Sequence, residues 1–342
     1  MSRGQNDKKK ERKKVETFQV PSSLDLITEN IIITNKITPK ISTEELFKQA
    51  SKYHVQGNIS KAAKYYQLLI NQGFEDHRVF SNYSLILKSF GKLIDAELST
   101  RKAISLKPDF AEAHLNLGII LMDIEKFKDA ELSLRKAIEL KPHLAEAHSN
   151  LGIILMDQDN LVDAELSTRK AIELKPNFAE AHSNLGKILK DHGNLKDAEL
   201  SLRKAIVHDP NFAEAHLNLG ILLMDITNLK DAELSLRKAI SLNPLLSKAH
   251  TNLALILKYQ GNIQEAELSA RKAIELKPDF AKAHSNLGII LNDLGKLQDA
   301  ELSAHKAIEI KPDFAKAYYS ISLIKYSDEK RYGRINSFLK IS

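Results

Sequence analysis

The chain has 342 residues, of which 43% are hydrophobic, and it contains no cysteine. A disulfide framework and a cysteine metal site are therefore excluded, and no apolar run reaches the roughly 18 residues that a membrane-spanning helix requires. Because the basic N-terminus also lacks the apolar stretch of a secretory signal, we expect a soluble, cytoplasmic protein.

The net charge of +6 is concentrated at the N-terminus. Residues 1–14 hold seven Lys and Arg residues against Asp7 and Glu11, which gives +5 and leaves +1 for the rest of the chain. Residues 1–42 contain one short apolar patch, Ile27–Ile33, which is too small to fold alone. We predict a basic, disordered leader over 1–42; the alternative is a segment that lies in the groove of its own array or of another.

From residue 43 onward the sequence repeats every 34 residues. The prolines show this spacing most clearly: Pro108, Pro142, Pro176, Pro210, Pro244, Pro278 and Pro312. Self-similarity at a fixed period indicates an array of stacked structural units. We divide the array into eight 34-residue units over 43–314, of which the first is degenerate, and a partial terminal capping unit over 315–342.

Each unit is predicted to form two short helices. In the unit that starts at Ala111, apolar residues recur at helical spacing over 111–124 and again over 128–141. Five units have a glycine in the connection, which predicts a left-handed helix end: Gly57, Gly91, Gly193, Gly261 and Gly295. In five units the residue after the proline predicts an N-cap: Asp109, Asn177, Asn211, Asp279 and Asp313. Helices this short must stack on neighbouring pairs to bury their apolar stripes.

The spacing of these residues resembles a known family. Five positions match the pattern of the tetratricopeptide repeat: Leu117, Gly118, Ala130, Ala137 and Pro142. His114, Leu121 and Leu134 stand where that family usually has Trp, Tyr and Phe. The resemblance implies an all-α fold, a right-handed superhelical α-solenoid of helix–turn–helix units whose first helices line a concave groove.

An asparagine recurs in the first helix of seven units: Asn82, Asn116, Asn150, Asn184, Asn218, Asn252 and Asn286. Asparagine is a mediocre helix former, because its amide competes for backbone groups. The array is similar to the tetratricopeptide half of protein O-linked glycosyltransferases, which implies that these amides hold an extended peptide backbone. The alternative, to which we give equal weight, is a hydrogen bond to a neighbouring helix.

The same stripe of the first helix carries charged and flexible residues. Its leading position is acidic in four units and basic in three: Glu112, Glu146, Glu180 and Glu214, then Lys248, Lys282 and Lys316. Further along the stripe lie Met122, Met156, Asp123 and Asp157. We therefore predict a peptide-binding groove that is acidic in one half and basic in the other, with adaptable methionines at its surface.

Histidine and an Arg-Lys pair also recur once per unit. Equivalent residues of stacked helices lie roughly 8–10 Å apart, too far to share one ion, so we interpret the histidines as partly buried packing residues. Each Arg-Lys pair follows a glutamate by four residues, as Arg135 follows Glu131, which predicts a charge-balanced outer surface and not a nucleic-acid site. We predict no cofactor, no metal site and no catalytic residues.

Three functions are considered. We favour a non-catalytic scaffold that binds a protein or peptide in the concave groove. The second is the substrate-recruiting adaptor, or a truncated receptor part, of a glycosyl-, sulfo- or methyltransferase, whose partner would be that enzyme. The third is binding of nucleic acid or an anionic surface through Arg3–Lys14. The sequence leaves the ligand, the pathway and the oligomeric state open.

Overall fold

The computed structural model describes residues 42–326, which are helical apart from short turns. The first helices of successive pairs are α1 (Thr43–Val55), α3 (His77–Ser89), α5 (Ala111–Asp123), α7 (Ala145–Asp157), α9 (Ala179–Asp191), α11 (Ala213–Asp225), α13 (Ser247–Tyr259) and α15 (Ala281–Asp293). The second helices are α2 (Ile59–Asn71), α4 (Leu93–Leu106), α6 (Phe127–Leu140), α8 (Leu161–Leu174), α10 (Leu195–His208), α12 (Leu229–Leu242), α14 (Ile263–Leu276) and α16 (Leu297–Ile310).

Helical backbone continues over 315–326, where the described part ends. The predictions made for the leader before residue 42, and for the terminal unit beyond residue 326, lie outside the described residues. Within 42–326 no helix combines the length and the apolar character that crossing a membrane requires.

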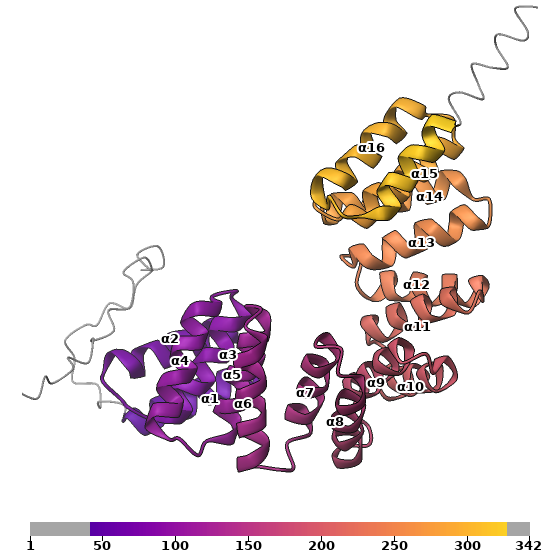
Figure 1. The fold of residues 1–342 in the computed structure, drawn as a ribbon. Helices are drawn as coiled ribbons and strands as arrows, with labels where there is room; N and C mark the ends of the chain where they lie inside the picture. The colour runs from indigo at the N-terminus through magenta and orange to yellow at the C-terminus, as the bar shows by residue number, and fades with distance from the viewer. Residues whose placement is uncertain (1–41, 327–342) are drawn as a thin grey trace, which may run out of the picture. The chain divides into compact units, whose positions relative to one another are not determined.

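The helices stack in chain order, each pair against the next (Figure 1). First helices of neighbouring pairs touch one another directly, as α9 touches α11 and α13 touches α15, whereas the second helices in the described part make no comparable contact with each other. The array therefore bends toward its first helices. We call the surface formed by the first helices the inner face and the surface formed by the second helices the outer face. The predicted all-α repeat solenoid is confirmed.

Small residues let the two helices of a pair approach closely. A Cβ placed on Gly186 of α9 would lie 2.6 Å from Cγ of Leu202 in α10, which is closer than two carbons can come. Ala198 and Ala205 on the same side of α10 have no exposed surface. Leucine, isoleucine and alanine of successive pairs then join into shared clusters that run from one pair into the next.

The turn inside each pair adopts the predicted left-handed conformation. The five glycines named above have φ between 72° and 85°. Glu125, Asp159 and Thr227 occupy the same position with φ of 61–63°. Side chains are disfavoured in this region, and a β-branched side chain is disfavoured most. The turn at Thr227 is therefore the most strained of the three.

The predicted N-caps are wrong by one residue. Helix α9 begins after Phe178, which makes no side-chain capping bond, and Asn177 lies one residue earlier in the turn. Phe178 is only 8% exposed and packs in a cluster with Ala145, Ala171 and Ala181. Burial of the aromatic ring against the preceding unit thus decides where the helix starts, and the polar residue is left in the turn.

We predict that Thr227→Gly stabilises the protein. Glycine removes the strain of a β-branched side chain at positive φ, which is worth about 1–2 kcal/mol, and this gain exceeds the added flexibility of the unfolded chain. The measurement is the midpoint of urea unfolding. Thr227→Ala is the control, because alanine keeps a Cβ at positive φ. An equal shift for both variants would show that the strain is not the cause.

Candidate functional site

The inner face is built from one stripe of each first helix, and neighbouring stripes are joined by hydrogen bonds. Asn116 donates from Nδ2 to Oγ of Ser81 in the preceding first helix at 3.1 Å. Asn184 and Asn218 repeat this bond at 3.1 Å, each to the serine 35 residues earlier, and Asn82 donates to the Tyr66 hydroxyl at 3.1 Å. Much of the asparagine ladder thus forms bonds within the array, which sequence reasoning had kept as one of two alternatives.

Whether this bond forms depends on the residue 35 positions before the asparagine, in the preceding unit. For Asn150 this residue is Leu115 instead of a serine, and within the described residues the Asn150 amide makes no hydrogen bond. Asn150 is partly exposed on the inner face. The alternation of serine and leucine at this position was visible in the sequence, and it was the signal that could have distinguished these asparagines.

The last two asparagines of the ladder are buried, with 4% and 1% of their surface exposed. Asn252 donates to the backbone oxygen of Lys248 at 2.9 Å and accepts a hydrogen bond from Nζ of Lys282 at 3.0 Å. Asn286 donates to the backbone oxygen of Thr251 at 3.2 Å, and its Oδ1 is buried without a partner. These two amides are thus engaged by their own and the neighbouring first helix and do not face an open surface.

The predicted acidic half of the groove is partly neutralised by lysines of the same unit. Glu112 accepts a hydrogen bond from Nζ of Lys141 at 2.8 Å, and this bond lowers the pKa of Glu112. Glu146 accepts from Lys175 at 3.2 Å. In the next two units the position of this lysine is filled by Asp209 and Asn243, and Glu180 and Glu214 are exposed. The acidic charge is thus left unpaired in the middle of the array.

At the C-terminal ends of the first helices, some units form an ion pair with the next unit and others have a methionine instead. Nζ of Lys88, Lys190 and Lys258 lies 2.9–3.2 Å from a carboxylate oxygen of the next first helix: Asp123, Asp225 and Asp293, respectively. Met122 and Met156 occupy the lysine position in two other units and pack partly buried against the core. Asp157 therefore faces Met122 instead of a lysine and remains exposed.

Lys187 of α9 replaces an isoleucine that other units have at this position, as Ile153 and Ile221 show. Burial lowers the pKa of the Lys187 ammonium, and the charge of Lys248 in α13 lowers it further, whereas Asp157 and Asp191 act in the opposite direction. A lowered lysine pKa means that the protein stabilises the charged ammonium less well than water does.

Lys282 of α15 is in the same situation. Burial lowers its pKa, Asp225 of α11 opposes this effect, and the charges of Lys190 and Lys248 add to it. Helices α9 and α15 are not neighbours in the stack, yet Lys190 of one acts on Lys282 of the other. The charges of these separate units are thus close enough to affect one another.

Lys316 completes this set at the start of the helical stretch 315–326. Burial lowers its pKa, and the charges of Lys282 and Lys258 lower it further. We call the six residues the lysine cluster: Lys187, Lys190, Lys248, Lys258, Lys282 and Lys316. Lys187 was not among the sequence-predicted site residues, and the signal that could have identified it is the replacement of the isoleucine found at this position in other units.

The recurring histidines form hydrogen bonds with the turns between units. Nε2 of His114, His148 and His182 lies 2.9–3.0 Å from the backbone oxygen of the proline six residues earlier, and the later units repeat this contact. At the end of the described array Tyr318 donates to the Pro312 oxygen at 2.9 Å and takes the same place. In the described part of the chain no three His, Asp or Glu side chains gather as metal ligands.

The outer face is charge-balanced as predicted. Arginine and glutamate of one helix pair four residues apart, with Arg135 Nη2 at 2.8 Å from Glu131 Oε1 and Arg169 Nη2 at 2.7 Å from Glu165 Oε1. The same pair recurs in α4, α10, α12 and α14. These arginines are therefore engaged within their own helices.

The tetratricopeptide repeat family model matches this chain over residues 115–179, 183–246 and 251–313. The chain belongs to the tetratricopeptide repeat family. These repeats lie within the array of helix pairs described above. A comparison with curated proteins found no match.

Solved structures resemble this tetratricopeptide array in fold. A chain of the APC/C hetero-tetramer Cut9–Hcn1 matches with a TM-score of 0.68 and 16% identity, over 84% of this chain and 56% of that one. A tetratricopeptide repeat protein from Parabacteroides merdae matches with a TM-score of 0.59 and 17% identity, over 73% and 98% of the two chains. Pseudomonas aeruginosa PilF matches with a TM-score of 0.55 and 18% identity, over 62% and 96%. At these identities the similarity is one of fold alone.

We predict that Asn184→Ala destabilises the array relative to Asn150→Ala. Both substitutions gain the same helix propensity, but only Asn184 loses a hydrogen bond between units, worth about 1 kcal/mol. The difference between the two urea midpoints measures that bond, and amide exchange in α7 and α9 locates it. Equal midpoints would mean that the Asn184–Ser149 bond contributes nothing to stability.

We predict that Lys187→Ile raises stability at neutral pH and flattens its rise at alkaline pH. In wild type the folded pKa of Lys187 lies below the unfolded value. Between these two pKa values the unfolded chain binds more protons, so the free energy of unfolding increases as pH rises toward about 10.4. Below the folded pKa both states carry the charge, and its burial lowers stability. The measurement is urea unfolding as a function of pH.

The exposed Lys196 of α10 supplies the control for this experiment. Lys196→Ile makes the same chemical change outside the inner face and should keep the wild-type pH dependence. A Lys187→Ile profile that runs parallel to wild type at every pH would contradict the assignment of this lysine as a buried charge.

Proposed function

We propose that this chain is a non-catalytic scaffold that binds an extended, acidic segment of a partner protein across its inner face. The observation that carries the proposal is the lysine cluster, in which the partly buried Lys187, Lys282 and Lys316 are each affected by the charge of at least one other cluster lysine. Two members of the cluster, Lys190 and Lys258, are also paired with Asp225 and Asp293. Charges of one sign that converge in a partly desolvated site favour a ligand of the opposite sign.

A carboxylate bound among these lysines would stabilise them in two ways. It would supply the hydrogen-bond acceptors that partly buried ammonium groups such as Lys187 lack, and it would offset the repulsion between the ammonium groups. Lys282 already bridges to Asn252, so its ammonium is held in place before a ligand arrives. A held donor loses less conformational entropy on binding than a free one.

The rest of the inner face suits an extended chain. We propose that the free amide of Asn150 pairs with the peptide backbone, since one amide both donates and accepts a hydrogen bond. Met122 and Met156 provide adaptable apolar contacts beside it. The unpaired Glu180 and Glu214 lie on α9 and α11 in the middle of the array. They set the register by repelling acidic residues of the ligand from this part of the face.

The test uses a fluorescein-labelled peptide of alternating Glu and Gly, with binding measured by fluorescence anisotropy on the full chain. We expect the triple variant Lys248→Gln, Lys282→Gln, Lys316→Gln to weaken binding at least roughly tenfold, because each lost charged hydrogen bond contributes about 1.5–3 kcal/mol. The matched control is Lys204→Gln, Lys238→Gln, Lys272→Gln on the outer face. It makes the same change in net charge and should leave the affinity within about twofold.

Two further peptides complete the design, one with Gln and one with Lys in place of Glu. Binding of the Glu peptide alone supports the proposal. Equal losses in the two triple variants would reduce the effect to net charge, and equal binding of all three peptides would reduce it to backbone contacts. Either result overturns the assignment of the lysine cluster as the site for acidic residues.

A further inference from the structure

One repeat position of the first helices carries a charged residue in five successive units. Its members lie in α9, α11, α13, α15 and the helical stretch 315–326, each 34 residues after the last, and the sign of the charge changes once along the array. We call these residues the charge row: Glu180, Glu214, Lys248, Lys282 and Lys316. A ligand that lies along the inner face here meets one charge per unit.

The charged groups of this row are available to a ligand. Glu180, Glu214 and Lys248 are exposed, and within the described residues their side chains form no hydrogen bond or ion pair. Lys316 is half-buried and likewise has no side-chain partner between residues 42 and 326. Lys282 donates to a neutral amide oxygen at 3.0 Å, and in the described part of the chain no carboxylate forms an ion pair with it.

Hydrogen bonds between first helices hold successive members of the row at a regular distance. Besides the asparagine–serine bond between α9 and α11, Asn286 of α15 donates to the Thr251 backbone oxygen of α13 at 3.2 Å. The hydroxyl groups of Ser285 and Ser320 join α15 to the next helical stretch at 3.1 Å. Helices in direct contact have their axes about 8–10 Å apart, so the charges of the row follow one another at about this distance.

This distance selects the backbone conformation of a matching ligand. Side chains on the same face are about 6.6 Å apart in a β-strand and about 5.4 Å apart along an α-helix. A polyproline II helix has three residues per turn and rises about 3.1 Å per residue, so every third side chain points to the same side at intervals of about 9.3 Å. A polyproline II segment therefore presents one side chain to each unit of the array.

The backbone of such a segment also suits a surface made of helices. The backbone N–H and C=O groups of the first helices are bonded within those helices, so the inner face offers no edge on which a β-strand could pair. A polyproline II segment has no internal hydrogen bonds and keeps its backbone solvated, so it needs no such edge. It is also ordered before binding, which lowers the entropy lost in the complex.

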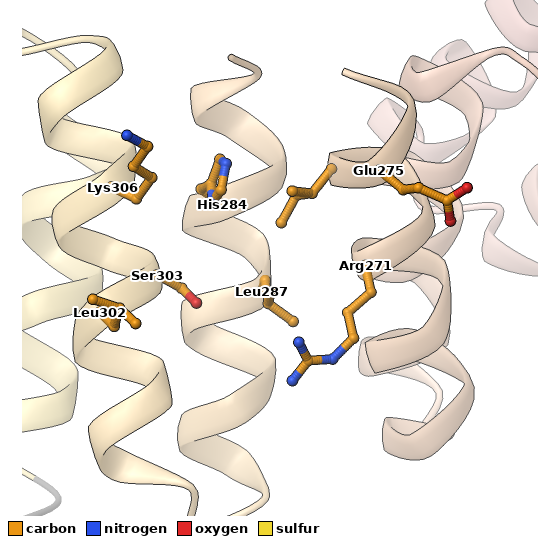
Figure 2. Close-up of a pocket in the computed structure, with 8 residues that line it drawn as sticks. Arg271, Glu275, His284, Leu287, Leu302, Ser303 and Lys306 are labelled. Carbon is orange, nitrogen blue, oxygen red and sulfur yellow. The ribbon is translucent and has the colours of Figure 1, made fainter. Parts of the chain in front are cut away.

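The outer face lacks a comparable row of free charges. Figure 2 shows the groove between α14 and α16, which has a volume of about 570 Å³ and has Leu302 among its lining residues. The charges around it are paired, with Arg271 Nη2 at 2.8 Å from Glu267 Oε1 and Lys306 Nζ at 2.8 Å from Glu309 Oε1. A ligand with regularly spaced charges is therefore matched by the inner face.

We propose that the inner face binds a polyproline II segment of a partner protein that has a charged residue at every third position. Acidic residues of the segment lie opposite the three lysines of the charge row, and basic residues lie opposite its two glutamates. Acidic residues at the lysines are part of the proposed function, on which this inference rests; the spacing, the backbone conformation and the basic residues go beyond it.

The spacing is tested with two fluorescein-labelled peptides of identical composition, each with three Glu and six Pro. One has Glu at every third position and the other has Glu at every second position between flanking prolines. In a polyproline II helix the second arrangement turns two of its three Glu away from the lysines. We expect the every-third peptide to bind the full chain at least about tenfold more tightly by fluorescence anisotropy, because carboxylate–ammonium hydrogen bonds are strong.

A double-mutant cycle assigns the middle Glu of the every-third peptide to Lys282. In wild type, replacement of this Glu by Gln should weaken binding at least about fivefold, whereas in Lys282→Gln it should cause no further loss, because the lysine that it contacts is gone. The control variant is Lys238→Gln on the outer face, in which the replacement should cost as much as in wild type. Circular dichroism checks that both variants are folded.

The basic residues are tested with longer peptides, in which two Lys-Pro-Pro triplets come before or after the acidic triplets. At least one of the two orders should bind more tightly than the same peptide with Gln-Pro-Pro triplets. The double variant Glu180→Gln, Glu214→Gln should abolish this gain. The matched control is Glu139→Gln, Glu173→Gln on the second helices, where both carboxylates are paired with lysines, and it should keep the gain.

The outcomes separate this inference from the proposed function. Equal affinity for the two spacings, with both weakened by the triple lysine variant, overturns the three-residue spacing and leaves the proposed function standing. Binding of the alternating Glu and Gly peptide but of neither proline-containing peptide overturns the polyproline II conformation alone. No gain from Lys triplets in either order overturns the basic residues. Absence of binding by every acidic peptide overturns both proposals.

Discussion

The whole array depends on how closely the two helices of each pair approach through small side chains. A Cβ on Gly152 would lie 2.1 Å from the hydroxyl oxygen of Thr168, and one on Gly220 would lie 2.7 Å from Cγ of Leu236. No ordinary side chain fits at these contacts. The close approach flattens each pair into a layer, and a flat layer can bury its remaining apolar stripe only against the next layer. Stacking is therefore the sole way in which these short helices become stable.

The same geometry gives the two faces opposite chemistry. First helices touch one another, so long polar side chains on the inner face are pressed against neighbours from other units, as Lys282 is against Asn252. Second helices are separated by the first helix between them, so grooves remain open on the outer face and leucines such as Leu302 stay exposed beside them. The inner face thus holds charged groups from different units in contact, whereas the charges of the outer face are paired within their own helices beside exposed leucines.

Features that depend on local pattern could be predicted from the sequence. Helices expected over 111–124 and 128–141 are Ala111–Asp123 and Phe127–Leu140, because apolar spacing and glycine turns act within a few residues. Features that depend on contacts with the neighbouring unit could not be predicted from the sequence. Phe178 overrides Asn177 at the start of α9 because the ring is buried against the preceding unit. The Asn184 amide likewise finds its partner 35 residues earlier, in another layer.

The candidate site lies between these two cases. Its charged residues could be identified from the sequence, since the change from Glu214 to Lys248 at one repeat position is plain. Whether each charge is paired could not be predicted. Glu112 is paired and Glu180 is unpaired, because a lysine ends the unit of Glu112 and an aspartate ends the unit of Glu180. Residue type at a repeat position thus predicts where a side chain lies, whereas its partners depend on a residue some thirty positions away.

Lys187 shows why a departure from the repeat carries more information than the repeat itself. Isoleucine at this position would cover the core and cost nothing, as Ile153 and Ile221 do, whereas a partly buried ammonium lowers stability. One such lysine could extend its head group into water. Several lysines that converge on one volume cannot all do so without approaching one another. In the proposed function, an anion bound among them would stabilise every member of the set and, by linkage, the folded array. The proposed affinity for an acidic ligand and the local loss of stability thus follow from the same arrangement of charge.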